Sequence, residues 1–158
     1  RIADVLMYLR FTGQRLNDVL TMAPDDVKEN RVHVVQEKTG KKVWVPLHDR
    51  LIEYRERRKV IGFQTICVTT TGTGWTVDGF ETVFGRIRED FGFGDVGERV
   101  HLHGLRKNAV ISLLEVGCSV DEVMAITGQS EKMVRHYAKE IDRQKLADSG
   151  MKKWNENA

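Results

Sequence analysis

The chain has 158 residues, of which 41% are hydrophobic and 30% charged, as in a globular domain that buries a sizeable core. No apolar run approaches the length of a membrane span, and the formal net charge of +2 is too small to indicate a nucleic-acid partner by itself. Cys67 and Cys118 stand apart without a CxxC motif, which argues against a disulfide framework and favours a reducing cytoplasm.

The first part of the chain predicts two helices and a hairpin. Apolar residues at helical spacing in 2–12 predict a helix that ends at Gly13, and a short helical piece follows at 15–22. The runs 31–37 and 41–47 alternate β-branched and polar residues and are joined by Lys-Thr-Gly, a pattern typical of two strands and their turn.

The middle of the chain predicts a helix, a strand and a second helix. An amphipathic helix is expected at 50–61, closed by Gly62, and the apolar run 65–69 indicates a short strand. A longer amphipathic helix is expected at 76–91, and the Gly-rich stretch 92–100 is expected to be irregular.

The last third of the chain predicts three helices, at 104–117, 119–128 and 130–143. Ser119 and Ser130 are the expected N-caps of the last two, and the first of these carries a capping box. The expected fold class is therefore mixed α+β, mostly helical with a small antiparallel sheet.

Positive charge is concentrated in one stretch of the sequence. Between Arg31 and Lys59, nine lysines and arginines stand against four acids, whereas the rest of the chain carries a net charge of −3. A basic stripe on a near-neutral body is typical of a phosphate-binding face, although a solvated helix face would have the same composition.

Motifs of several enzyme classes are absent from the sequence. There is no P-loop, zinc-protease or nucleophile-elbow motif, and no cluster of carboxylates spaced for metal ions. His101 and His103 lack a further His or Cys at a useful distance, so we expect neither a metal nor another cofactor.

Groups suited to phosphate lie instead at the ends of the expected elements. Arg15 opens a short helix beside unpaired backbone N–H groups, and Arg106 lies in the first turn of a later helix. His103 precedes Arg106 by one turn on the same side, Lys38 lies at the hairpin tip, and Tyr137 lies on an amphipathic helix. Taken singly, each has an ordinary alternative: a surface arginine, a turn lysine, a capping or buried histidine, or a core tyrosine.

The combination and order of these residues favour a function. The blocks TGQRLNDVL, EKTGKKVWVPL, HGLRKNAV and TGQSEKMVRHYAK together resemble the catalytic domain of tyrosine recombinases, the phage integrase family. The resemblance extends from about residue 12 to residue 137. The catalytic residues that it implies are the two arginines Arg15 and Arg106, the hairpin lysine Lys38, the histidine His103 and the nucleophile Tyr137.

The resemblance also implies a fold and partners. The implied fold is the DNA breaking-rejoining fold of integrase catalytic cores, with residues 1–158 forming one catalytic domain. A separate N-terminal core-binding domain, which would complete a clamp around DNA, is expected to be absent from this chain, which opens without a Met. The C-terminal tail, 140–158, would dock on a neighbouring protomer or else pack on its own domain.

The partners implied are double-stranded DNA and a homo-tetramer assembled on it, with a monomer in isolation. The side chains that we expect to contact DNA are Lys41, Lys42, Arg55, Arg58 and Lys107.

The implied reaction is the site-specific cutting and rejoining of DNA in integration and recombination. A tyrosine oxygen attacks a phosphodiester and leaves a 3′-phosphotyrosyl link and a 5′-hydroxyl, so rejoining needs neither metal nor ATP. Forked, always-charged guanidiniums suit the charge that builds on the phosphate oxygens. His103 would accept the tyrosine proton and Lys38 would protonate the leaving oxygen, with Lys41 and Lys42 as fallback candidates.

One position departs from the family pattern. Gln129 stands where a histidine or tryptophan is usual, and its amide can donate to a phosphate oxygen but cannot accept and carry a proton. We therefore expect Gln129 to position the phosphate. A catalytically silent DNA-binding relative is one alternative, and a type IB topoisomerase with a similar residue set is another.

Overall fold

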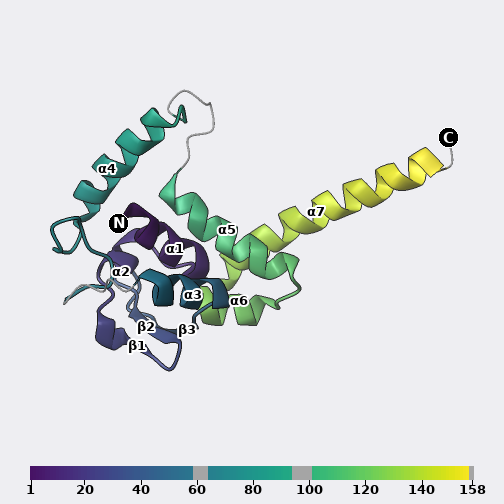
Figure 1. Ribbon diagram of the computed structural model, residues 1–158. Helices are drawn as coiled ribbons and strands as arrows, with labels where there is room; N and C mark the ends of the chain where they lie inside the picture. The colour runs from purple at the N-terminus through teal and green to yellow at the C-terminus, as the bar shows by residue number, and fades with distance from the viewer. Residues whose placement is uncertain (59–63, 94–100, 157–158) are drawn as a thin grey trace.

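The computed structural model describes residues 1–58, 64–93 and 101–156 (Figure 1). Within them the chain is mostly helical with one small antiparallel sheet, which confirms the expected fold class. The elements are, in chain order, α1 (Ile2–Thr12), α2 (Leu16–Leu20), a 3₁₀ turn (Pro24–Asp26), β1 (Val27–Lys28), β2 (Arg31–Val35), β3 (Lys42–Pro46), α3 (Asp49–Arg58), α4 (Val77–Asp90), α5 (Leu102–Glu115), α6 (Val120–Thr127) and α7 (Glu131–Glu156).

The sheet has the order β1-β2-β3, so it contains the predicted hairpin and one further strand. In the hairpin, Val32 pairs with Val45 and Val34 with Val43, and all four side chains are buried on one face. The strand that the sequence did not predict, β1, joins β2 through Glu29 and Asn30, which both adopt positive φ (49° and 57°). A two-residue turn with positive φ at both positions usually carries Asn-Gly, so Glu-Asn gave no hairpin signal.

The strand predicted at 65–69 is wrong. This segment forms only an isolated bridge between Val68 and Gly74, while the N–H of Ile66 donates to the carbonyl of Met22 at 2.8 Å. Ile66, Cys67 and Val68 are nevertheless buried. A short apolar run signals burial, and burial alone does not distinguish a strand from an irregular buried segment.

Two clusters of buried side chains hold the fold together. The larger one joins α1, the inner face of the sheet and α3, and the smaller one joins α5, α6 and α7 through Val110, Val123, Val134 and Tyr137. The predicted N-cap at Ser119 is confirmed, since its hydroxyl accepts from the N–H of Glu122 at 3.2 Å and the Glu122 carboxylate accepts from the N–H of Ser119 at 2.7 Å. The expected helix end at Gly62 lies outside the described residues.

Helix α7 is longer than the sequence predicted. It runs for 26 residues, and Figure 1 shows its C-terminal half extending away from the rest of the molecule. Every residue from 142 to 155 is exposed, so the alternative that the tail packs on its own domain is wrong for these residues. Among the helices of the described ranges, none has the length and apolarity needed to cross a membrane.

Candidate active site

Two helices end in the same tripeptide and with the same local structure. The last residue of α1 and of α6 is the threonine of a Thr-Gly-Gln sequence, at 12–14 and 127–129. The glycine that follows has a left-handed φ in each case (64° and 66°). Both threonine hydroxyls donate to the carbonyl four residues earlier (2.6 and 2.7 Å) and accept from the glutamine N–H two residues later (3.3 Å in each). Each helix therefore stops at a defined residue, and its last carbonyls point outward toward other elements.

Arg106 joins these two helix ends. Its side chain, which is only 3% exposed, donates from Nη1 to the carbonyl of Gly13 and from Nη2 to the carbonyl of Thr127 at 3.0 Å. A guanidinium has five N–H donors, so three remain for a ligand. Burial, with the nearby charge of Arg15, lowers the pKa of Arg106 to about 10, which leaves the group protonated at neutral pH.

Arg15 lies beside Arg106 and is more exposed. It sits at the N-cap position of α2, with 28% of its side chain exposed, and its Nη1 is 3.3 Å from the Gln36 Oε1 and 3.7 Å from the Asp18 carboxylate. The charges of Arg15 and Asp18 act on the pKa of Arg106 in opposite directions. The two guanidiniums repel each other, since the charge of Arg15 lowers the pKa of Arg106. A phosphate placed between them would offset this repulsion.

The hairpin turn is fastened to α2 just before Lys38. The N–H of Glu37 donates to the Asp18 Oδ1 at 3.0 Å, and the Glu37 carboxylate accepts from the side chain of Asn17. Lys38 follows directly and is exposed on this turn. Lys41 lies across the turn, where its Nζ donates to the carbonyl of Gly128 at 3.3 Å, and Lys42 is exposed at the start of β3.

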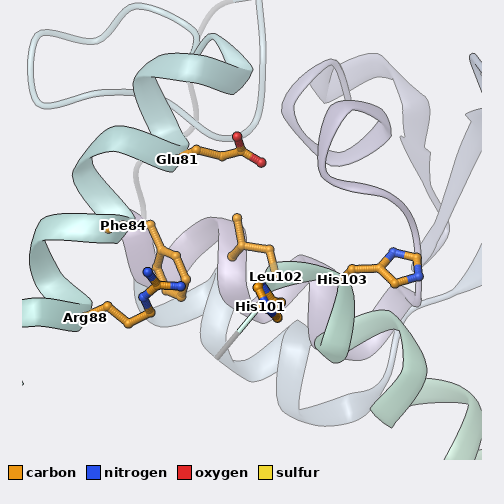
Figure 2. Close-up of a pocket in the computed structure, with 7 residues that line it drawn as sticks. Glu81, Phe84, Arg88, His101, Leu102 and His103 are labelled. Atoms are coloured by element: carbon orange, nitrogen blue, oxygen red, sulfur yellow. The ribbon is translucent and has the colours of Figure 1, made fainter. Parts of the chain in front are cut away.

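His103 lies one turn before Arg106 in α5 and is exposed, so it is not a core histidine. The N-cap of α5 is His101, whose side chain makes no capping bond. A pocket of about 360 Å³ separates this helix start from α4, and its lining is Glu81, Phe84, Gly85, Arg88, His101, Leu102 and His103. Figure 2 shows the His103 ring pointing away from the α4 side chains that line the other wall of this pocket.

Tyr137 is buried against α5. Its ring, 8% exposed, packs with Val110, Val123 and Val134, and the Nζ of Lys107 lies 5.5 Å from the ring centroid. The phenol is close enough to act on the pKa of Arg106. Lys107 and His136 both approach the Glu140 carboxylate, at 3.8 and 3.3 Å.

Gln129 is half-buried at the junction between α6 and α7, two positions before α7 begins.

Arg55 and Arg58, the two arginines expected to contact DNA, lie on α3, apart from the pair formed by Arg15 and Arg106. Arg58 donates to both carboxylate oxygens of Asp4 (2.7 and 3.1 Å), and Arg55 is half-buried on the same helix. Asp4 is nine residues before Gly13 on α1, a rise of about 13 Å. The Arg58 guanidinium is therefore fixed near the opposite end of α1 from the arginine pair.

Sequence reasoning missed three buried polar residues of the site, Gln14, Asp18 and Gln36. Gln36 continues the inward-facing alternation of Val32 and Val34, where an apolar residue would be expected, and that break was the available signal. For Gln14 the signal was the repetition of Thr-Gly-Gln.

In the described part of the chain, no group of three or more His, Cys, Asp or Glu side chains is placed to hold a metal ion.

Comparison with known proteins places this site in a family. The family model named Phage integrase family matches residues 1–144. Prophage integrase IntE of Escherichia coli (strain K12) is 40% identical over 50 residues, which are 32% of this chain and 13% of that protein.

Two solved structures share the fold. A lambda integrase dimer bound to a COC′ core site has a TM-score of 0.74 and 24% identity, over 87% of this chain and 51% of that one. The lambda integrase catalytic core has a TM-score of 0.68 and 24% identity, over 80% of this chain and 82% of that one. The chain thus spans about half the length of the lambda integrase in the complex. Because the family model covers nine tenths of the sequence, including every residue from Arg15 to Tyr137, the chain belongs to the phage integrase family.

Proposed function

We propose that this chain is the catalytic domain of a site-specific DNA recombinase that cuts and rejoins strands through a 3′-phosphotyrosyl intermediate. The observation that carries the proposal is the convergence of two guanidiniums, Arg15 and Arg106, beside a tyrosine ring packed on the same helix as Arg106. Family membership supports the same reading.

The proposed cleavage step is a transesterification, in which one phosphorus–oxygen bond forms and one breaks. A bond forms between the Tyr137 oxygen and the phosphorus, and the bond from phosphorus to the 5′-oxygen of the next nucleotide breaks. The phenol proton passes to His103, and Lys38 gives a proton to the departing 5′-oxygen. Because the covalent link retains the energy of the phosphodiester, attack by a 5′-hydroxyl reverses the step without ATP.

The arginine pair supplies the charge stabilisation in this proposal. Arg106 keeps three N–H donors after binding two carbonyls, and Arg15 keeps Nε and Nη2, because its two protein contacts both involve Nη1. These donors would bind the nonbridging phosphate oxygens, where charge builds in the transition state. By analogy with oxyanion holes, loss of one guanidinium would raise the activation barrier by about 3–4 kcal/mol. Gln129 would add an amide donor rather than a proton carrier.

Partners and location follow from the same proposal. A similar lambda integrase structure is a dimer bound to a core site, which supports DNA as the partner and an oligomer as the form assembled on it. We propose that the DNA is double-stranded and that this oligomer is a homo-tetramer. We propose that a core-binding domain on another segment completes the DNA clamp, and that the tail from residue 140 onward docks on a neighbouring protomer. DNA as substrate and two free cysteines favour the cytoplasm.

The test is covalent capture on a nicked suicide DNA substrate. The short fragment that carries the new 5′-hydroxyl diffuses away, so the covalent intermediate cannot be rejoined and is trapped. Wild-type chain is expected to give a denaturant-resistant protein–DNA adduct, and Tyr137→Phe is expected to bind the DNA without forming one. Tyr54→Phe, which changes a tyrosine bonded to Asp4 away from the site, is the matched control and should keep the adduct. An adduct that survives Tyr137→Phe rejects this nucleophile, and DNA binding by wild type with no adduct favours the silent relative.

A further inference from the structure

Gln36 has the most completely bonded side chain in the vicinity of the arginine pair, and it is fully buried. Its Oε1 accepts from the Arg15 Nη1 at 3.3 Å and from the Thr39 hydroxyl at 3.1 Å. Its Nε2 donates to the Gln14 Oε1 at 2.6 Å and to the carbonyl of Thr127 at 2.9 Å. An amide has two acceptor positions and two donor hydrogens, so all four are used.

The orientation of this amide is set by its neighbour. The Nε2 of Gln14 donates to the carbonyls of Thr12 and Ile126, both at 3.0 Å, so the Gln14 Oε1 is left as an acceptor. Gln36 must therefore turn its Nε2 toward Gln14, which turns its Oε1 toward Arg15. A chain of two buried amides thus fixes which atom Arg15 meets.

The side chain of Gln36 packs tightly against Gly128, the residue that follows α6. A Cβ placed on Gly128 would lie 2.5 Å from the Gln36 Nε2 and 2.8 Å from its Cδ, closer than real contacts allow. Gln36 therefore packs directly against the backbone that leads into α7, the helix of Tyr137. The same Thr127 carbonyl that accepts from Gln36 also accepts from Arg106.

We propose that Gln36 is a positioning residue for the DNA-cleaving reaction, which acts by aligning the Arg15 guanidinium with the Arg106 guanidinium at the end of α6. This inference rests on the proposed function. Arg15 is the more exposed of the two arginines, and its ion pair with Asp18 is long at 3.7 Å, so that pair alone restrains it loosely. The Gln36 contact holds Nη1 against the protein and leaves Nε and Nη2 for phosphate.

The test is a double-mutant cycle in single-turnover cleavage of the suicide substrate at saturating DNA. Gln36→Met keeps the volume of the side chain but removes the acceptor that faces Arg15, and misplacement of a catalytic group by a fraction of an ångström predicts a rate loss of about tenfold or more. In the Arg15→Lys background, where no fork remains to align, the same change should cost less than about threefold. The affinity for DNA should stay within about threefold of wild type in both, since most phosphate contacts are untouched.

Val34→Ala is the matched control, because it removes buried contacts from the same strand and leaves Gln36 in place. It should lower thermal stability and leave the cleavage rate of the folded protein unchanged. Equal rate losses from Gln36→Met in the wild-type and Arg15→Lys backgrounds would overturn the proposal, because Gln36 would then act independently of Arg15. So would a Gln36→Met variant that cleaves as fast as Val34→Ala. Failure of wild type itself to form an adduct is a different outcome, which overturns the proposed function and this inference with it.

Discussion

The guanidinium of Arg106 donates to the carbonyl of Thr127 at 3.0 Å, and this bond ties helix α5 to the residue that ends α6. The next helix begins at Glu131 and carries Tyr137. The side chain that we propose binds phosphate therefore also joins α5 to the segment that leads to Tyr137, the proposed nucleophile.

Arg106→Lys should lower both stability and cleavage. A compact ammonium cannot reproduce the fork that reaches Gly13 and Thr127, so at least one of these buried carbonyls loses a charge-assisted hydrogen bond at a cost of about 1–3 kcal/mol. Urea unfolding and adduct formation measure the two effects. Arg135→Lys changes an exposed arginine paired with Glu131 and should alter stability by less than about 0.5 kcal/mol. Equal losses in the two variants would contradict the fastening role.

Gly128→Ala should be among the most damaging glycine substitutions in the chain. The position combines a left-handed φ of 66° with a Cβ position 2.5 Å from Gln36, so we expect a loss of about 2 kcal/mol or more. Gly150 lies inside α7, where a methyl group would meet nothing within 4 Å, and Gly150→Ala should raise helix stability by up to about 1 kcal/mol. Thermal unfolding of both variants is the measurement, and a tolerated Gly128→Ala would show that Gln36 can move aside.

Much of the fold was predictable because its signals are local. The end of α1 at Gly13 and the capping box at Ser119 depend on residues within four positions of each other, and both are present. The strand β1 was missed because its turn uses Glu-Asn, and 65–69 was assigned wrongly because burial was taken for a strand. The first error reflects an unusual turn sequence, and the second arises because the bond from Ile66 to Met22 lies outside the local segment.

The same division holds for the site. Arg15, Arg106 and Tyr137 were identified through the resemblance of their sequence blocks to the tyrosine recombinases, and the structure places them close together, although their chemical roles stay predictions. Gln36 was not identified, because its partner Thr127 is 91 positions away in the sequence. A polar residue on an inward strand position is visible in the sequence, but the group that satisfies it is not.

Arg58→Met should affect stability in a pH-dependent way. Burial raises the pKa of Asp4, but the bonds from Arg58 and Tyr54 outweigh it, so the folded-state pKa lies below the usual 3.8. A depressed carboxyl pKa stabilises the fold above the unfolded-state value and loses that contribution as the pH falls through the folded-state value. Arg58→Met should therefore be destabilised at pH 7, with a difference from wild type that shrinks below about pH 4. Unfolding at several pH values is the measurement, and a difference independent of pH would contradict the ion-pair account.

The salt dependence of DNA affinity distinguishes the ion pair of Arg58 with Asp4 from the DNA contact predicted for Arg58. Lys42→Ala, which removes an exposed charge near the turn of the hairpin, should reduce the slope of log affinity against log salt by about one phosphate contact. If Arg58→Met reduces the slope equally, Arg58 contacts DNA despite its bond to Asp4.

Lys38→Ala should slow cleavage of ordinary DNA but not of DNA whose scissile 5′-oxygen is replaced by sulfur. A thiol has a pKa near about 8.5, far below that of an alcohol, so the sulfur leaves without a proton from a general acid. Lys41→Ala is the matched control from the same turn, and its bond to Gly128 predicts a modest loss on both substrates. Rescue of Lys41→Ala instead of Lys38→Ala would move the general-acid role to Lys41, which the sequence allowed as a fallback.

Trp154→Ala should weaken assembly on DNA and leave the folding of the monomer unchanged. Leu146, Met151 and Trp154 are 72%, 53% and 69% exposed, in the part of α7 where every residue from 142 to 155 is exposed. Successive residues are about 100° apart on a helix, which places these three within an arc of about 140°, as expected for a face that another protomer covers. Unfolding should show no change in stability, while the mass of the DNA-bound complex by analytical ultracentrifugation should fall. Lys145→Ala, which changes an exposed residue beside Leu146 and leaves the three apolar side chains in place, is the control for a substitution elsewhere on this helix. Loss of monomer stability with unchanged assembly would reject docking of the tail.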